Sequence, residues 1–293
     1  MTMSLFRPRT RTAARTTTAL LGAAALTALC AATASAATQG WVRTGTLSVG
    51  SLTGGEGLAS LDDGSLVYRG LGSIPLDLRI RGWNHVGDPD ASRGYVFDAY
   101  QGGDTATKKM FAVTTQDGTR YLYEHPLDAG EKLNNSFAAV SPDAQWLVSG
   151  EWGDQGRLQV FPAPLLNPAT PATGGTLPQA GQITLDHPVR DIQGCDFVTA
   201  TQLVCASDDA ATDLFPDPRP LLQVDLPHAL DGTEVTGHVS DLGPLPQQSV
   251  CTGTFEAEGV DYDPHSGVLR AQVVPPGACQ VGTTVYEYRR DGA

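Results

Sequence analysis

The chain has 293 residues, of which 41% are hydrophobic, which is ample for the core of one large or two small domains. Charged residues make up only 17%, while 33 glycines and 20 prolines predict many turns and few long helices. A formal net charge of −13 repels phosphate backbones and therefore argues against nucleic-acid binding.

The first 36 residues have the three parts of a secretory signal peptide. Four arginines without an acidic residue precede an apolar run from Ala19 to about Ala32, and Ala34-Ser35-Ala36 follows. The run is shorter and less apolar than the roughly 20 residues of a membrane span. Lipidation at Cys30 is the alternative. The residue before Cys30 is Leu29, however, whereas a lipoprotein signal typically has a small residue at that position. We expect cleavage after Ala36 and a secreted protein without a membrane span.

Cleavage makes the remaining chain more acidic. The 257 residues after Ala36 keep 15 of the 19 basic residues and all 32 acidic ones, so their net charge is −17. The acidity therefore belongs to the folded part, which we expect to be one monomeric domain over residues 37–293.

Alternating apolar and polar residues predict an all-β fold. A unit of polar residue, short strand, Asp/Gly/Ser-rich turn and second strand begins near residues 56, 85, 135, 193 and 258. Most of these intervals are near the 40 to 50 residues of a four-stranded propeller blade, although the later ones are longer and the first is short.

The clearest predicted blade has four strands, at 83–86, 95–100, 109–114 and 120–124. The next has strands at 137–140, 146–150, 157–161 and 182–185, but the last unit has three, at 259–262, 268–273 and 284–288. The N-terminal strand at 45–50 is free to complete the last blade and close the ring. The sequence thus predicts a β-propeller of about five blades, with a β-sandwich as the alternative.

The four cysteines that follow the signal peptide predict two disulfides in an oxidising compartment. Cys195 and Cys205 fall opposite one another on a predicted hairpin, so they are the local pair. Cys251 and Cys279 then pair by elimination. A zinc site is disfavoured, because the sequence has no Cys-x-x-Cys.

Two fragments resemble the starts of blades in secreted bacterial β-propellers. They are Glu-Gly-Val-Asp-Tyr-Asp-Pro-His-Ser-Gly-Val-Leu at 258–269 and Val-Ser-Pro-Asp-Ala-Gln-Trp-Leu-Val at 140–148. They are similar to the broad group of SMP-30-like lactonases, phytase-like esterases and strictosidine-synthase-like proteins. Such motifs mark the fold and not one activity.

Each unit opens with a polar residue that a propeller would point into its central channel. These openings are Glu56, His85 or Asn84, Asn135 or Asn134, Gln193 or Asp196, and Glu258. Hard oxygen donors of this kind suit calcium. The resemblance implies calcium held by Glu56, Asn135 and Glu258, with His85 as a catalytic base. The same residue types also serve in turns, where they bond the backbone.

Two distinctive strings are candidates for ligand binding. Trp83 and Asn84 belong to Trp-Asn-His, while Glu151, Trp152 and Asp154 belong to Glu-Trp-Gly-Asp. Their aromatic rings could stack on sugars and their polar groups could bond hydroxyls, although aromatic residues also build cores.

Three functional readings follow. The first is an extracellular module that binds a small molecule, a glycan or a protein. The second is a calcium-dependent hydrolase of the lactonase or esterase type. The third is a structural or adhesion protein of the cell envelope. Nucleophile-elbow, Walker A and dinucleotide motifs do not occur in the sequence.

Overall fold

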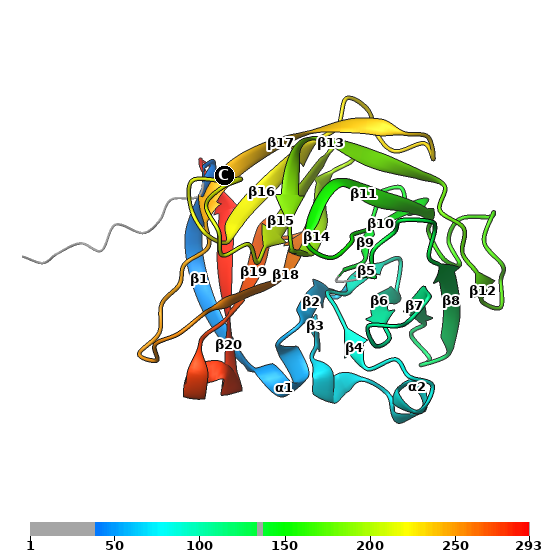
Figure 1. The fold of residues 1–293 in the computed structure, drawn as a ribbon, viewed down its shortest axis with the longest axis horizontal. Helices are drawn as coiled ribbons and strands as arrows, with labels where there is room; N and C mark the ends of the chain where they lie inside the picture. Colours follow the sequence, from blue (N-terminus) through cyan, green and yellow to red (C-terminus); the bar gives the residue numbers. More distant parts are fainter. Residues whose placement is uncertain (1–38, 134–136, 293) are drawn as a thin grey trace, which may run out of the picture. The chain divides into compact units, whose positions relative to one another are not determined.

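Five short strands form a ring around one axis in the computed structural model, which describes residues 39–133 and 137–292. Each ring strand contacts the next, and the last contacts the first. Figure 1 shows the five labels gathered near the middle of the ribbon. The inner strands of the described residues are β2 (Gly57–Ser60), β5 (Asp90–Ser92), β9 (Ala139–Val140), β14 (Ile192–Thr199) and β18 (Glu256–Asp263). They begin blades I to V, respectively.

Blades II, III and IV are sheets that run outward from these inner strands, antiparallel except that β12 pairs in parallel with β8. Blade II adds β4 (His85–Val86), β6 (Tyr95–Gln101), β7 (Lys108–Thr114), β8 (Arg120–Pro126) and β12 (Gly175–Thr176). Blade III adds β10 (Trp146–Ser149), β11 (Asp154–Pro162) and β13 (Gly181–Arg190). Blade IV adds β15 (Gln202–Ser207), β16 (Pro220–Asp225) and β17 (Val235–Pro244). The predicted strands of blades II and III are confirmed.

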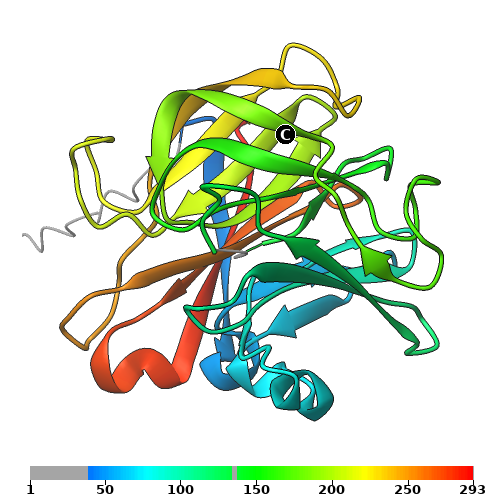
Figure 2. The same ribbon diagram turned by 45° about the vertical axis from the view of Figure 1, so that its right-hand side comes forward.

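Blade V is closed by the N-terminal strand, as the sequence predicts. Its strands β19 (Val268–Val274) and β20 (Gly282–Arg290) are followed by β1 (Trp41–Gly50), which pairs antiparallel with β20. Figures 1 and 2 both show β1, in blue, beside β20, in red. Strands from opposite ends of the described chain thus complete one sheet, and the propeller prediction, not the sandwich, is confirmed.

Blade I departs from the four-strand pattern. In the described chain its sheet contains only β2 and β3 (Leu66–Arg69). Short helical segments take the place of outer strands, because Gly70, Gly72 and Pro75 interrupt the strand pattern. These segments are α1 (Ser51–Gly54), η1 (Leu71–Ser73) and α2 (Leu76–Ile80), while η2 (Gly277–Val281) lies in blade V.

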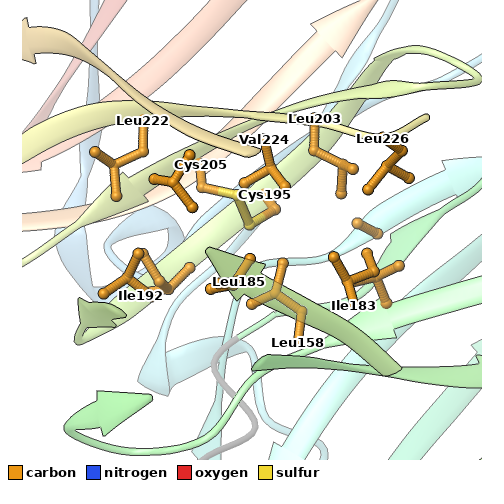
Figure 3. Packing of buried hydrophobic residues seen from close by; sticks show 14 of the residues in the cluster. Leu158, Ile183, Leu185, Ile192, Cys195, Leu203, Cys205, Leu222, Val224 and Leu226 are labelled. Carbon is orange, nitrogen blue, oxygen red and sulfur yellow. A yellow bond between two sulfur atoms is a disulfide. The ribbon is translucent and has the colours of Figure 1, made fainter. Parts of the chain in front are cut away.

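Blades III and IV are joined more closely than other neighbours. Their outermost strands β13 and β17 pair in parallel, so the two blades form one eight-stranded sheet. Between the blades lies the largest apolar cluster, in which Leu222 and Val224 of blade IV face Leu158 and Ile183 of blade III (Figure 3).

Both predicted disulfides are present. Cys195 and Cys205 are directly opposite on β14 and β15, and their bridge is buried in the cluster between blades III and IV. The second bridge joins Cys251 to Cys279. Since this bridge links the segment before β18 to η2, it ties together two long loops of blade V.

Candidate functional site

Asp88 is fully buried among the inner strands of the ring. Its carboxylate accepts hydrogen bonds from the Leu58 amide at 3.0 Å and the Val260 amide at 2.9 Å, and its carbonyl accepts one from Ala138 at 2.9 Å. Burial raises the pKa of the Asp88 carboxyl well above its usual range. A Cβ added to any of three neighbouring glycines would collide with this residue: Gly57, Gly194 and Gly259. Asp88 therefore touches all four other blades.

The upper mouth, where the inner strands begin, brings together three of the residues predicted from the sequence. The His85 Nε2 atom lies 3.7 Å from the Glu56 carboxylate. Burial, followed by the charge of Glu256, raises the pKa of Glu56 to about 7. Burial, followed by the charge of Glu56, raises the pKa of Glu258 well above its usual range. Burial lowers the pKa of His85, which favours its neutral form.

The predicted calcium ligand Asn135 lies outside the described residues, so the proposed ligand set is not complete here. Among the described residues, one group places three donor atoms within 4.8 Å of one another, namely His125, Asp128 and Glu131. The Lys109 ammonium already lies 2.9 Å from one Glu131 oxygen, and His125 Nε2 lies 2.9 Å from the other. The positive charge that a metal would supply to Glu131 is therefore already present.

The predicted ligand-binding residues of blade II do not form an open platform. The Trp83 side chain is only 4% exposed and packs with Ile74, Leu78 and Tyr100. Asn84 is exposed beside it. Trp83 thus contributes to the core that closes the outer part of this blade.

The two acidic residues predicted to bind a ligand in blade III each form an ion pair with a different arginine. Glu151 accepts two hydrogen bonds from Arg157, at 2.9 and 3.1 Å. Asp154 pairs with Arg190. Trp152 is 58% exposed, which leaves its ring available to a ligand.

The lower mouth, where the inner strands end, holds a cavity of about 290 Å³. All five blades line it, through the ends of the inner strands and the turns that follow them. We call this space the lower cavity. Five aspartates line it. Three of them, Asp90, Asp196 and Asp261, bond the backbone of a neighbouring blade, and of these Asp196 is 8% and Asp261 3% exposed.

Each of these carboxylates binds the backbone of a neighbouring blade. Asp90 accepts a hydrogen bond from the Val140 amide at 2.5 Å, and Asp196 accepts one from the Tyr262 amide at 2.6 Å. Asp261 accepts one from the Ser60 amide at 2.6 Å. These bonds fix the carboxylates in place. Each oxygen of Asp90 and Asp196 accepts one such bond and keeps a second lone pair for a ligand, whereas Asp261 Oδ2 already accepts bonds from Ser60 and Arg270.

Burial raises the pKa of all three carboxylates, and repulsion from neighbouring carboxylates adds to it at Asp90 and Asp196. Burial, followed by the charge of Asp261, raises the pKa of Asp90 to about 7. Burial, followed by the charges of Asp90 and Asp261, raises the pKa of Asp196 well above its usual range. Burial also raises the pKa of Asp261, against the opposing effect of its ion pair with Arg270 at 2.8 Å. Near neutral pH the cavity can therefore both donate and accept hydrogen bonds.

Sequence reasoning named only one member of this carboxylate set. Asp196 was an alternative channel residue, whereas Asp90 belongs to an Asp-Pro-Asp string typical of a turn. Asp261 lies inside the repeated fragment at 258–269, three residues after the expected Glu258. The signal that could have found Asp261 was the alternation of residues along β18. A register shift in that strand separates Glu258 from Asp261 in this alternation.

Comparisons with known proteins do not assign the chain to a family. No protein-family model matches the chain, and no curated protein sequence matches it. Among solved structures, the chain is similar to a native arabinanase of Bacillus subtilis, with a TM-score of 0.42 and 10% identity, over 85% of this chain and 92% of that one. It is also similar to a chain of the mitotic checkpoint complex, with a TM-score of 0.38 and 10% identity, over 85% of this chain and 95% of that one. The β-propeller class itself follows from the ring of five blades.

Proposed function

We propose that this protein is a secreted β-propeller that binds a non-acidic glycan in its lower cavity. The observation that carries the proposal is the convergence of Asp90, Asp196 and Asp261 on a space of about 290 Å³ lined by all five blades. That volume lies at the small end of the range for ligand pockets and suits one sugar unit.

The chemistry of the lower cavity suits hydroxyl groups. A hydroxyl both donates and accepts a hydrogen bond, and partly protonated carboxyl groups offer both complementary roles. The backbone bonds that hold the carboxylates reduce the entropy lost when a ligand is ordered. Tyr262 and His265 also line the cavity and supply ring surfaces for a sugar.

Charge restricts the class of glycan. Apart from the carboxylate triad, the lower cavity is lined by Asp62, Asp263 and Arg93, so its acidic residues outnumber its one arginine, and the described domain belongs to an acidic chain. Uronate, sulfate and phosphate groups would be repelled, whereas neutral and amine-bearing sugars would not. Secretion rests on the signal peptide expected at residues 1–36, which lies outside the described residues, and on the two disulfides.

An array of soluble oligosaccharides tests the proposal. It should contain neutral, amine-bearing and acidic members, and we expect signals from the first two classes alone. Ala200→Trp places a large ring at the exposed turn that lines the lower cavity, and should abolish the signals without removing a carboxylate. Ala211→Trp makes the same change on the exposed loop between β15 and β16 and should leave them intact.

The array also separates the lower cavity from the tryptophan string of blade III. If Trp152→Ala removes binding and Ala200→Trp does not, the ligand lies at the upper side and the proposed site is wrong. A complete lack of signal across the array would remove the glycan proposal and favour a structural or adhesion role.

A second candidate is a calcium-dependent hydrolase of the lactonase or esterase type. The observation that favours it is the meeting of Glu56, Glu258 and His85 at the upper mouth, with Glu56 and Glu258 as metal ligands and His85 as base. Calorimetry with calcium tests it, together with melting in the presence of a chelator. Absence of calcium binding, or a Glu258→Gln variant that binds calcium as the wild type does, would remove this candidate.

A further inference from the structure

Two further hollows continue the lower cavity outward across blades I and II. The second hollow, of about 400 Å³, shares three lining residues with the lower cavity: Leu61, Asp62 and Ala91. The third, of about 370 Å³, shares four lining residues with the second: Gly94, Tyr95, Thr115 and Gln116. Because they share lining residues, the three hollows lie side by side, and we call them together the lower groove. It runs from the channel axis to Tyr121 on β8, three strands away from the inner strand β5.

The lower groove exists because blade I is short. A full blade would cover the flank of β6 and β7 in blade II, but the described part of blade I ends its sheet at β3. At the outer part of blade II, α2 takes over this role, since Ile74 and Leu78 pack against Trp83 and Tyr100. Among the described residues, no helix covers the lower side of this flank, where the second hollow lies.

The walls of the lower groove are held rigidly. Arg69 of β3 pairs with Asp98 of β6 through two bonds, at 2.5 and 3.2 Å, and Asp98 is only 3% exposed. The turn between β5 and β6 has both central residues in the left-handed region, Arg93 with φ 52° and Gly94 with φ 78°. This tight turn lies between the second and third hollows. It packs closely on the neighbouring turn, because a Cβ at Gly94 would meet the Gln116 side chain.

The chemistry of the lining favours a sugar chain over a peptide. Tyr95 and Tyr121 are partly exposed, and their rings are surrounded by hydroxyl, amide and carboxylate groups from the turn at 114–119. Aromatic faces among hydrogen-bonding groups match the faces and edges of pyranose rings. An extended peptide would instead require alternating side-chain pockets beside an open strand edge.

We propose that the lower groove binds a linear, non-acidic oligosaccharide. One sugar unit occupies the lower cavity and the following units lie along the second and third hollows, against Tyr95 and Tyr121. This inference rests on the proposed function and adds the form of the ligand. It predicts that affinity depends on chain length, which a site limited to the lower cavity would not.

Calorimetry with two series of oligosaccharides tests the inference on the full mature chain. The series are β-1,4-linked glucose oligomers and β-1,4-linked glucosamine oligomers, each of two to six units. In at least one series we expect the affinity to rise about tenfold or more from two units to six, or about 1.4 kcal/mol. Thr119→Trp, which blocks the third hollow at an exposed turn, should remove this gain and leave the affinity for the dimer unchanged. Thr212→Trp, on an exposed loop outside the groove, should preserve the gain.

The outcomes separate the two proposals. Equal affinity for all lengths, or a gain that survives Thr119→Trp, overturns the lower groove but leaves binding in the lower cavity standing. A length gain that Thr119→Trp removes, combined with dimer affinity that Ala200→Trp does not change, overturns the sugar unit in the lower cavity and leaves binding along the second and third hollows alone. Failure of every oligomer to bind overturns both.

Discussion

Acidification from pH 8 to pH 5 is expected to stabilise this protein, which is the reverse of ordinary acid denaturation. Burial and neighbouring charges raise the pKa of Asp90 from 3.8 to about 7 and that of Glu56 from 4.5 to about 7. Burial raises the pKa of Asp208 from 3.8 to about 6. Each group has a higher pKa in the folded chain than in the unfolded chain, so the folded state binds more protons in this range. Stability therefore falls as pH rises from 5 to 8.

The size of the effect follows from the same values. A carboxyl group with a pKa near 7 when folded and near 4 when unfolded gains about 2.5 kcal/mol of folding free energy between pH 8 and pH 5. In a domain of this size each kcal/mol shifts the melting temperature by roughly 2 to 4 °C. Asp90 alone thus corresponds to about 5 to 10 °C. The carboxyl groups with lowered pKa values, such as Glu131, are mostly ionised in both states above pH 5 and oppose it little, whereas His85, whose pKa burial lowers, offsets part of the gain.

Differential scanning calorimetry between pH 5 and pH 8 measures this dependence. Asp90→Asn removes one titrating group. The melting temperature of this variant should therefore depend less steeply on pH than that of the wild type, even if the substitution changes its stability at every pH. Asp217→Asn changes an exposed carboxyl of the loop between β15 and β16 and should keep the wild-type slope. A melting temperature that rises with pH in this range, or an unchanged slope for Asp90→Asn, would refute the reasoning.

Three further changes test the packing. Lys109→Met removes a fully buried ammonium that bonds the Gly150 carbonyl at 2.9 Å, and should cost about 3 to 5 kcal/mol in urea unfolding because Glu131 loses its partner. Lys108→Met, whose side chain is 45% exposed, should cost less than about 1 kcal/mol. Gly259→Ala should destabilise by about 1 to 3 kcal/mol or more, whereas Gly156→Ala, with no neighbour within 4 Å, should not. Replacing both cysteines of the β14 and β15 hairpin by serine should lower unfolding free energy by about 2 to 3 kcal/mol, and mass spectrometry of the wild type should find no free thiols.

The strands could be predicted because they depend on local pattern. Alternating residues and turn clusters locate the strands of blades II and III, and the pairing of Cys195 with Cys205 follows from the hairpin alone. Closure by β1 was also predictable, since the last unit has one strand fewer than a full blade. The short first interval, from residue 56 to residue 85, indicated that blade I has fewer strands than the others. No pattern in the sequence indicated that helical segments would replace its outer strands.

The candidate sites could be predicted only in part. Residues that open the inner strands were expected in the channel; His85 lies 3.7 Å from Glu56, and the charge of Glu56 acts on the pKa of Glu258. The lower cavity was not expected, because Asp90 and Asp261 owe their place to the ends of strands from different blades. No local pattern distinguishes an Asp in a turn from one that bonds a neighbouring blade.

The sequence by itself determined an acidic, all-β chain with two disulfides and repeated strand units, because periodicity, composition and cysteine spacing act over a few residues. Only the tertiary structure decided which residues surround Asp88. Asp88 bonds Leu58 and Val260, residues 30 and 172 positions away, and three distant glycines make room for it. Such contacts exist only after the ring has closed, since closure brings inner strands from all five blades to one axis.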